Sequence, residues 1–180
     1  PISGVPIPKA ANIYSFSMAD ITQDGNIEIL IADKSGAFVV ENGTGDRLWE
    51  SADRFAASFD YMLGEEFDTT LRGSIDKNAT AQSRSTQVTT REKVYLSAPI
   101  LIADLDGDER PEAIVNKNIS GLLGRGFIDI NFFGKSELNS LSWNGLTMLA
   151  NWHTPAFQGM STAYDVADMN GDGGKELLVA

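Results

Sequence analysis

The sequence predicts an all-β fold, and three observations carry this prediction. Apolar residues occur in short runs of strand length that are rich in β-branched side chains. An Asp-rich segment recurs three times, each time between two such runs. Residues 13–50 show no sustained helical period. Strands joined by tight polar loops are therefore expected throughout the chain.

The chain divides into units of several strands, beginning with residues 13–52. We expect residues 1–12 to be an N-terminal extension or a strand of a preceding unit. In the first unit, apolar runs at 15–19, 29–31, 37–40 and 47–49 predict four short strands. The Asn/Gly-rich residues 42–46 between the last two runs predict a hairpin turn.

The later part of the chain repeats this pattern after an interruption. Residues 53–93, in which residues 74–91 are rich in Ser, Thr, Gln and Asn, predict an insertion or long loop. Residues 94–160 form the second unit, with strands expected at 98–103, 113–115, 127–130 and from 138 onwards to 152. Residues 161–180 form an incomplete third unit, with strands at 163–167 and 177–179.

The repeated Asp-rich segments predict metal-binding loops. Counted from the first Asp of each loop, side-chain oxygens recur at positions 1, 3, 5 and 9, and a backbone carbonyl at position 7 can complete the set. Six or seven oxygen ligands in a flexible loop suit Ca²⁺ better than Mg²⁺ or a transition metal. The predicted ligands are Asp20, Thr22, Asp24, Asn26 and Glu28; Asp104, Asp106, Asp108, Arg110 and Glu112; and Asp168, Asn170, Asp172, Gly174 and Glu176.

An EF-hand is excluded because its bidentate Glu stands at position 12, where these loops have Ile31, Val115 and Val179. The alternative to a metal site is an Asp/Gly-rich turn that binds no ion. The loops differ in detail. Glu109 replaces a Gly at position 6 of the second loop, so we expect a different backbone there. In the first loop Thr22 is a neutral ligand and Gln23 replaces a Gly, so this loop is the weakest of the three.

The segment Asp168-Met169-Asn170-Gly171-Asp172-Gly173-Gly174-Lys175-Glu176 resembles the FG-GAP/VCBS repeat of bacterial proteins and of the integrin-α N-terminal propeller. The flanking residues 31–33, 45–49 and 141–146 are similar to the later strands of such repeats. The resemblance implies a partial β-propeller of about two and a half four-stranded antiparallel blades, with Ca²⁺ held between the first two strands of each blade. It also implies a complete ring of blades, so either the chain is a fragment of a longer polypeptide or other chains supply the missing blades.

Composition narrows the function. The chain has 180 residues, with 14 Lys+Arg against 25 Asp+Glu and a net charge of −11, so a nucleic-acid partner is not expected. Ten of the 25 acidic residues are predicted ligands in the three loops. The absence of Cys and the presence of only one His exclude thiolate nucleophiles and multi-His metal centres within one chain. The longest apolar run is far too short to span a membrane.

We therefore expect a calcium-binding structural, adhesion or interaction module with a protein or glycan partner, or with further blades as its partner. Extracellular calcium modules bind at about 10⁻⁴–10⁻³ M, which favours the periplasm, the cell surface or a secreted assembly. A non-catalytic role is favoured. The alternative is a calcium-dependent propeller enzyme such as a polysaccharide lyase, which needs a basic residue at a carbohydrate cleft. Arg and Lys are few in this chain, and none is expected to cluster with aromatic residues. The aromatic residues Trp49, Trp143 and Trp152 are expected to pack between blades, with sugar stacking as the alternative.

Overall fold

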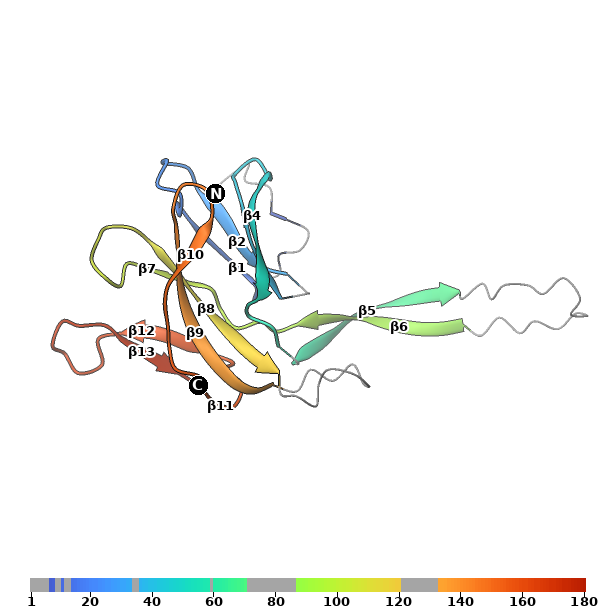
Figure 1. Ribbon diagram of the computed structural model, residues 1–180. Helices are drawn as coiled ribbons and strands as arrows, with labels where there is room; N and C mark the ends of the chain where they lie inside the picture. Colours follow the sequence, from blue (N-terminus) through green and yellow to red (C-terminus); the bar gives the residue numbers. More distant parts are fainter. Residues whose placement is uncertain are drawn as a thin grey trace, which may run out of the picture.

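The computed structural model describes residues 7–8, 11, 14–33, 36–58, 60–70, 87–120 and 133–180. These residues form antiparallel sheets and contain no helix, which confirms the predicted all-β class (Figure 1). Within the same residues, no helix is long and apolar enough to cross a membrane. The strands are β1 (Phe16–Ala19), β2 (Glu28–Ala32), β3 (Ala37–Glu41), β4 (Arg47–Arg54), β5 (Tyr61–Thr70), β6 (Gln87–Tyr95), β7 (Leu101–Ala103), β8 (Glu112–Ser120), β9 (Phe133–Trp143), β10 (Met148–His153), β11 (Phe157–Gln158), β12 (Tyr164–Ala167) and β13 (Glu176–Val179).

The first sheet contains β1 to β4, and each strand pairs with its neighbour in sequence. The four strands predicted for the first unit are thereby confirmed, although β4 continues past residue 52 to Arg54. The turn between β3 and β4 is closed by Asn42, whose Oδ1 accepts hydrogen bonds from the backbone N–H groups of Thr44 and Asp46. An Asn side chain that bonds to the backbone two and four residues onward favours such a turn.

The second sheet repeats this order with β7, β8, β9 and β10, and β11 pairs with the early part of β9. The strand predicted at 98–103 is shorter than expected, because β7 begins only at Leu101. The strand predicted at 127–130 lies outside the described residues. The two predicted strands of the third unit are present as β12 and β13, which form a two-stranded sheet.

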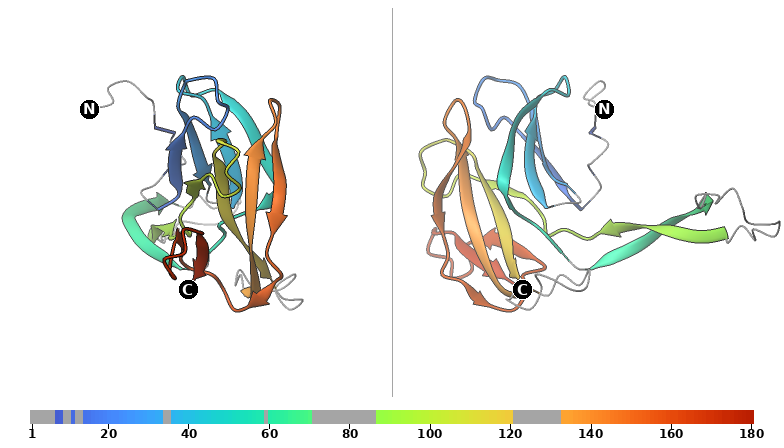
Figure 2. Two further views of the ribbon diagram at one scale, coloured as in Figure 1. Left: turned by 90° about the vertical axis from the view of Figure 1, so that its left-hand side faces the viewer. Right: turned by 45° about the vertical axis from the view of Figure 1, so that its right-hand side comes forward.

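The sheets stack face to face (Figure 2). Leu30, Phe38 and Val40 of the first sheet share a core with Val115 and Leu141 of the second. The opposite face of the second sheet meets the third sheet in a separate core. This core contains the buried Ile114, Leu138 and Tyr164 and the partly buried Leu177. β8 is therefore covered on both faces, and both faces of β2 are also buried, which explains the apolar runs at 29–32 and 113–115.

Part of the segment predicted to be an insertion or long loop is a β-ribbon. β5 and β6 pair antiparallel with each other and project away from the stacked sheets (Figure 1). The loop alternative is therefore wrong for residues 61–70 and 87–93, while residues 71–86 lie outside the described part of the chain. The polar composition of the segment resembles that of a loop because the two paired strands pack against no other sheet and need few apolar residues. Thr and Val are nonetheless favourable in strands.

Buried polar groups join the second sheet to the third. The Tyr164 hydroxyl accepts a hydrogen bond from the N–H of Asn116 at 3.2 Å, and it also lies within hydrogen-bonding distance of the carbonyls of Pro99 and Ile114. Burial raises the pKa of Tyr164 above its ordinary value, so the hydroxyl remains a donor across the physiological range. Asn116 also donates from Nδ2 to the carbonyl of Ser161.

We expect Tyr164→Phe to lower the free energy of unfolding by about 1–3 kcal/mol, because it leaves the buried Asn116 N–H without its acceptor. Denaturant unfolding followed by circular dichroism measures this change. Tyr61→Phe is the matched control, since Tyr61 is 44% exposed and should change stability by less than about 0.5 kcal/mol. Equal effects of the two substitutions would contradict this role of Tyr164.

Candidate metal centres

The three Asp-rich loops occupy equivalent places in the three sheets. The first loop (residues 20–28) joins β1 to β2, the second (104–112) joins β7 to β8, and the third (168–176) joins β12 to β13. All three connections lie on the same side of the stack, at the left in Figure 1. Gln23 Nε2 of the first loop donates a hydrogen bond to the carbonyl of Glu109 in the second loop at 3.1 Å. Nothing in the sequence signals this contact between residues that are distant along the chain.

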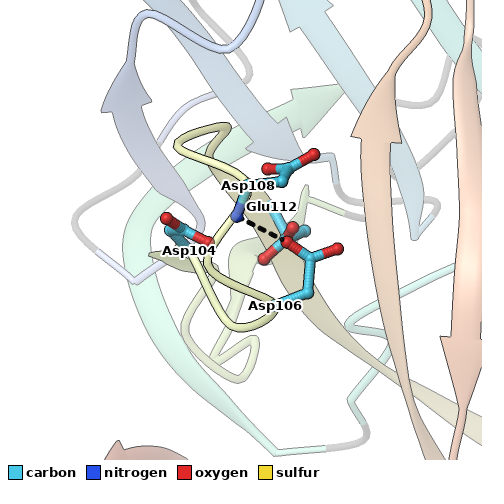
Figure 3. Close-up of side chains that lie close together, drawn as sticks. All are labelled: Asp104, Asp106, Asp108 and Glu112. Carbon is cyan, nitrogen blue, oxygen red and sulfur yellow. Dashed lines mark hydrogen bonds between the residues drawn. The ribbon is translucent and has the colours of Figure 1, made fainter.

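The second loop gathers four carboxylates. Asp104, Asp106, Asp108 and Glu112 each offer one oxygen, and these oxygens all lie within 4.8 Å of one another. Figure 3 shows the four side chains and the hydrogen bond from the Asp108 N–H to Asp106. Glu112 is buried at the start of β8, whereas Asp106 and Asp108 are exposed. The structure therefore brings together the four predicted side-chain ligands of this loop.

The third loop gathers three carboxylates in the same way, from Asp168, Asp172 and Glu176. The fourth predicted side chain, Asn170, lies among them with its amide nitrogen inward. Its Nδ2 donates to Asp172 at 3.0 Å and to Glu176 at 3.1 Å. An amide NH₂ thus stands between two carboxylates where a cation would be favourable. Rotation of the Asn170 side chain is needed before its oxygen can join the carboxylate ligands.

The second and third loops have the same backbone hydrogen bonds. In both, the Asp at position 1 accepts from the N–H groups of positions 4 and 6. The Glu at position 9 accepts from the N–H of position 2, at 2.8 Å for Leu105 to Glu112 and 2.7 Å for Met169 to Glu176. The position-3 side chain accepts from position 5 in each loop. These bonds hold the carboxylate ligands on one side of the turn.

The first loop departs from this arrangement. Asp20 accepts from positions 5 and 6, and Glu28 accepts from the N–H of Thr22 at position 3. The carboxylates of Asp20, Asp24 and Glu28, all within the described residues, do not form a group like those of the other loops. Thr22 Oγ1 is buried beside the Glu28 carboxylate and has no hydrogen bond of normal geometry.

The expectation of a different backbone at position 6 of the second loop is wrong. Glu109 has φ 66°, close to the φ of 88° at Gly173 and of 87° at Gly25, so the residue change does not alter the backbone there. Position 4 is also left-handed in all three loops, including at Gln23. The hydrogen bonds of the loop hold Glu109 and Gln23 in a conformation that costs residues with a Cβ about 1–2 kcal/mol.

The buried Glu at position 9 is electrostatically unfavourable without a cation. Burial raises the pKa of Glu112 above its ordinary value of 4.5, the Leu105 N–H lowers it, and the charges of the three nearby Asp residues raise it again. Burial likewise raises the pKa of Glu28, opposed by the N–H and hydroxyl of Thr22, and the charges of Asp24 and Asp20 raise it further. A bound cation would relieve both the desolvation and the repulsion.

The donor chemistry fits a hard cation. All the gathered side-chain ligands are oxygen donors, and Asp and Glu oxygens in a flexible turn are typical of Ca²⁺ sites. The second and third loops fit such a cation best, because their carboxylates are gathered. The predicted carbonyl ligands at position 7, from Asn26, Arg110 and Gly174, stay predictions. The Asn26 side chain donates a hydrogen bond from its Nδ2 to Oδ1 of Asp24.

The ribbon provides a further feature that the sequence did not reveal. Lys93 Nζ lies 4.4 Å from the centroid of the Tyr61 ring, and Tyr61 also contacts Tyr95 edge to face. The expectation that no basic residue would cluster with aromatic rings was therefore wrong. Lys93 and Tyr95 are two residues apart on β6 and therefore share a face, and Tyr95 pairs with Tyr61 of β5. This spacing would have indicated the cluster if the segment had been predicted to be a ribbon.

Comparisons of the chain with protein-family models, with curated proteins and with solved structures find no match.

We expect Glu112→Gln to stabilise the metal-free protein at neutral pH, on the order of 1 kcal/mol, because it removes a buried charge but keeps an acceptor for Leu105. The pKa of Glu112 is raised in the folded state, so wild-type stability is fully present below about pH 4.5 and is lost as the pH rises through the raised pKa. The advantage of the variant should disappear in acid. Thermal melting in EDTA from pH 4 to 8 tests this, and with Ca²⁺ the order should reverse at neutral pH.

We expect Glu109→Gly to stabilise the protein by roughly 0.5–1 kcal/mol, because it relieves the left-handed backbone while the glycine adds freedom to the unfolded chain. Glu109→Gln is the control that removes the charge but keeps the Cβ. Gly107→Ala should destabilise by about 1 kcal/mol through its φ of 78° alone, since an added Cβ meets no atom within 4 Å. Chemical denaturation compares the three variants, and equal stability of the Gly and Gln variants would contradict the explanation.

Proposed function

We propose that this chain is a calcium-stabilised β-repeat module of the FG-GAP/VCBS type that serves as a structural or interaction scaffold. The observation that carries the proposal is the recurrence of one loop, with the Glu at position 9 and left-handed residues at positions 4 and 6, at the same place in successive sheets. Two four-stranded meanders stacked face to face, followed by the beginning of a third sheet, support a propeller-like arrangement of blades.

In this proposal the cation holds the first two strands of each sheet together. It is bound by carboxylates from the loop and by the Glu that begins the second strand, so its removal exposes the loop to the mutual repulsion of three or four negative charges. The second and third loops are the principal sites, because their carboxylates are gathered. The first loop binds more weakly, since its hydrogen bonds hold the ligands in a different register.

The proposed location is outside the cytoplasm. Sites built from exposed loops with several neutral or water-accessible positions belong to the affinity range of extracellular modules, about 10⁻⁴–10⁻³ M. Cytosolic calcium would leave such loops empty, whereas extracellular calcium would fill them. The proposed partner is a protein or glycan, or a further blade of the same assembly.

A non-catalytic role is part of this proposal, and the chemistry of the described residues supports it. The carboxylates of the second and third loops serve as cation ligands in this proposal. The single His153 is exposed, and its Nδ1 lies 3.1 Å from the Thr154 carbonyl. Lys93 and Tyr61 lie on the projecting ribbon rather than beside the loops. Release of new reducing or unsaturated ends from a panel of polysaccharides would contradict the scaffold function and support the lyase alternative.

We expect Ca²⁺ to raise the melting temperature of protein pretreated with EGTA, since each site adds roughly 2.7 kcal/mol when the ion is at about 100 times its dissociation constant. Equimolar Mg²⁺ should have a smaller effect. Asp104→Ala with Asp108→Ala, and Asp168→Ala with Asp172→Ala, should each remove part of the stabilisation. Asp20→Ala with Asp24→Ala should remove least. Melting that is indifferent to millimolar Ca²⁺ would show that the loops are ordinary turns.

A further inference from the structure

The chain contains three Asn-Gly dipeptides, and all three lie in connections between strands. They are Asn42-Gly43 between β3 and β4, Asn144-Gly145 between β9 and β10, and Asn170-Gly171 in the third loop. Such a dipeptide can deamidate without an enzyme, because glycine has no side chain to shield its backbone nitrogen from the preceding carboxamide. The structure places different hydrogen bonds on the reacting groups of the three dipeptides.

The reaction closes a ring between the two residues. The backbone nitrogen of the glycine loses its proton to water and attacks Cγ of the asparagine, which forms the N–Cγ bond. The Cγ–Nδ2 bond then breaks, and Nδ2 takes up a proton and leaves as ammonia. Water opens the resulting succinimide at one of its two carbonyls, which gives aspartate or isoaspartate. Hydrogen bonds that hold the carboxamide or the glycine N–H in another orientation oppose ring closure.

Asn170-Gly171 is held at both reacting groups. The Gly171 N–H donates to Oδ1 of Asp168 at 2.6 Å. Nδ2 of Asn170 donates to Asp172 and Glu176, and its Oδ1 accepts from the Asp172 N–H at 2.8 Å. The surrounding carboxylates also oppose loss of the proton from the glycine nitrogen, because the product would be a like charge. Ring closure is therefore most strongly opposed in this dipeptide.

Asn42-Gly43 is held at the side chain. Oδ1 of Asn42 accepts from the N–H and the hydroxyl of Thr44, at 3.0 and 2.7 Å, and from the N–H of Asp46 at 2.8 Å. Its Nδ2 donates to Oδ2 of Asp46 at 3.2 Å. The Thr44 hydroxyl and the Asn42 amide hold the pKa of Asp46 below its ordinary value, so a carboxylate stands beside the leaving amide. Four hydrogen bonds and one like charge oppose ring closure here.

Asn144-Gly145 is the least restrained of the three. Oδ1 of Asn144 accepts from the N–H groups of Leu146 and Thr147, at 3.0 and 2.9 Å. Within the part of the chain that the structure describes, neither Nδ2 of Asn144 nor the N–H of Gly145 has a hydrogen-bond partner. Both residues are exposed to water, and the turn from Asn144 to Thr147 contains no charged residue.

We propose that Asn144 is a site of spontaneous deamidation, and that the fold directs this modification to the turn between β9 and β10. The three dipeptides share the reactive sequence, so their hydrogen bonds make the difference. The two additional bonds on the Asn42 side chain correspond to a rate at least roughly tenfold below that of Asn144. Asn170, whose neighbouring glycine N–H is also bonded, reacts most slowly.

Isoaspartate at position 144 would disturb the end of the hairpin formed by β9 and β10. It inserts a methylene group into the main chain of a turn in which the Asn144 N–H donates to the Thr147 carbonyl at 3.1 Å. The next residues, Trp143 and Met148, pair with each other, and Met148 is buried in the core shared by the first two sheets. An exposed modification therefore reaches the contact between these sheets. The carboxylates of the three loops take no part in it, so the modification is separate from the proposed calcium binding.

The test ages the full chain at mildly alkaline pH and follows each Asn-Gly segment by mass spectrometry after digestion. EDTA is present throughout, so that no cation at the third loop affects Asn170. Synthetic peptides of residues 39–46, 141–148 and 167–174 give the rate of each sequence without the fold. We expect similar rates in the peptides. In the folded chain, Asn144 should deamidate at least roughly tenfold faster than Asn42 or Asn170.

Two variants assign the product and its effect. Asn144→Gln should remove the main deamidated species, because the longer side chain closes the corresponding ring far more slowly. Asn144→Asp has the charge of the products but a regular main chain. The isoaspartate form is separated by chromatography and identified by isoaspartate-specific enzymatic methylation. We expect the amides of β9 and β10 next to the turn to exchange hydrogen faster in the isoaspartate form than in Asn144→Asp.

Three results would overturn the proposal. The first is deamidation of Asn42 or Asn170 in the folded chain as fast as that of Asn144. The second is a set of peptides that already differ in the same order and by the same factors, because the sequence and not the fold would then direct the reaction. The third is equal hydrogen exchange in the isoaspartate form and in Asn144→Asp, which would remove the effect on the hairpin.

Discussion

Burial of the central strands on both faces is the constraint on which the rest of the structure depends. β2 lies between two apolar clusters, and β8 lies between the cores that the second sheet shares with the first and the third. Each central strand begins with the position-9 Glu, so stacking of the sheets buries that carboxylate as well. A charge is thereby fixed at the edge of an apolar layer, beside a turn that carries two or three more. The chemistry of the loops follows from the packing of the strands.

A buried carboxylate needs either hydrogen bonds or a countercharge. The backbone N–H groups of Leu105 and Thr22 supply the hydrogen bonds for Glu112 and Glu28, but the adjacent Asp side chains add repulsion. In the third loop the Asn170 amide provides a partial countercharge. Each loop thus manages the same electrostatic problem by different means. In the second and third loops, where the carboxylates are gathered, a bound cation would relieve it.

The sequence predicts the structure well where burial dictates the residue type and where ligand spacing dictates which carboxylates meet. The runs at Ile29 and Ala113 predict buried strands because both faces need apolar residues, and the repeated spacing predicts which carboxylates meet in the second and third loops. The ribbon was missed because its strands satisfy each other without a core. The register of the first loop was not predictable from its ligand spacing. There Thr22 does not accept the hydrogen bond that Asp106 and Asn170 accept from position 5, so the Asp24 N–H bonds to Asp20 instead.

The order of strands within each sheet also bears on how the chain folds. Every pairing in the first sheet, the ribbon and the third sheet joins strands that are adjacent in sequence. Each of these can close as soon as its own residues are available, without waiting for distant partners, which favours rapid folding for a β-protein. The contacts between sheets come afterwards, and they are the ones that span long separations, such as that between Asn116 and Tyr164. Synthesis from the N-terminus would then lay down the sheets one at a time, with each new sheet folding against a finished surface.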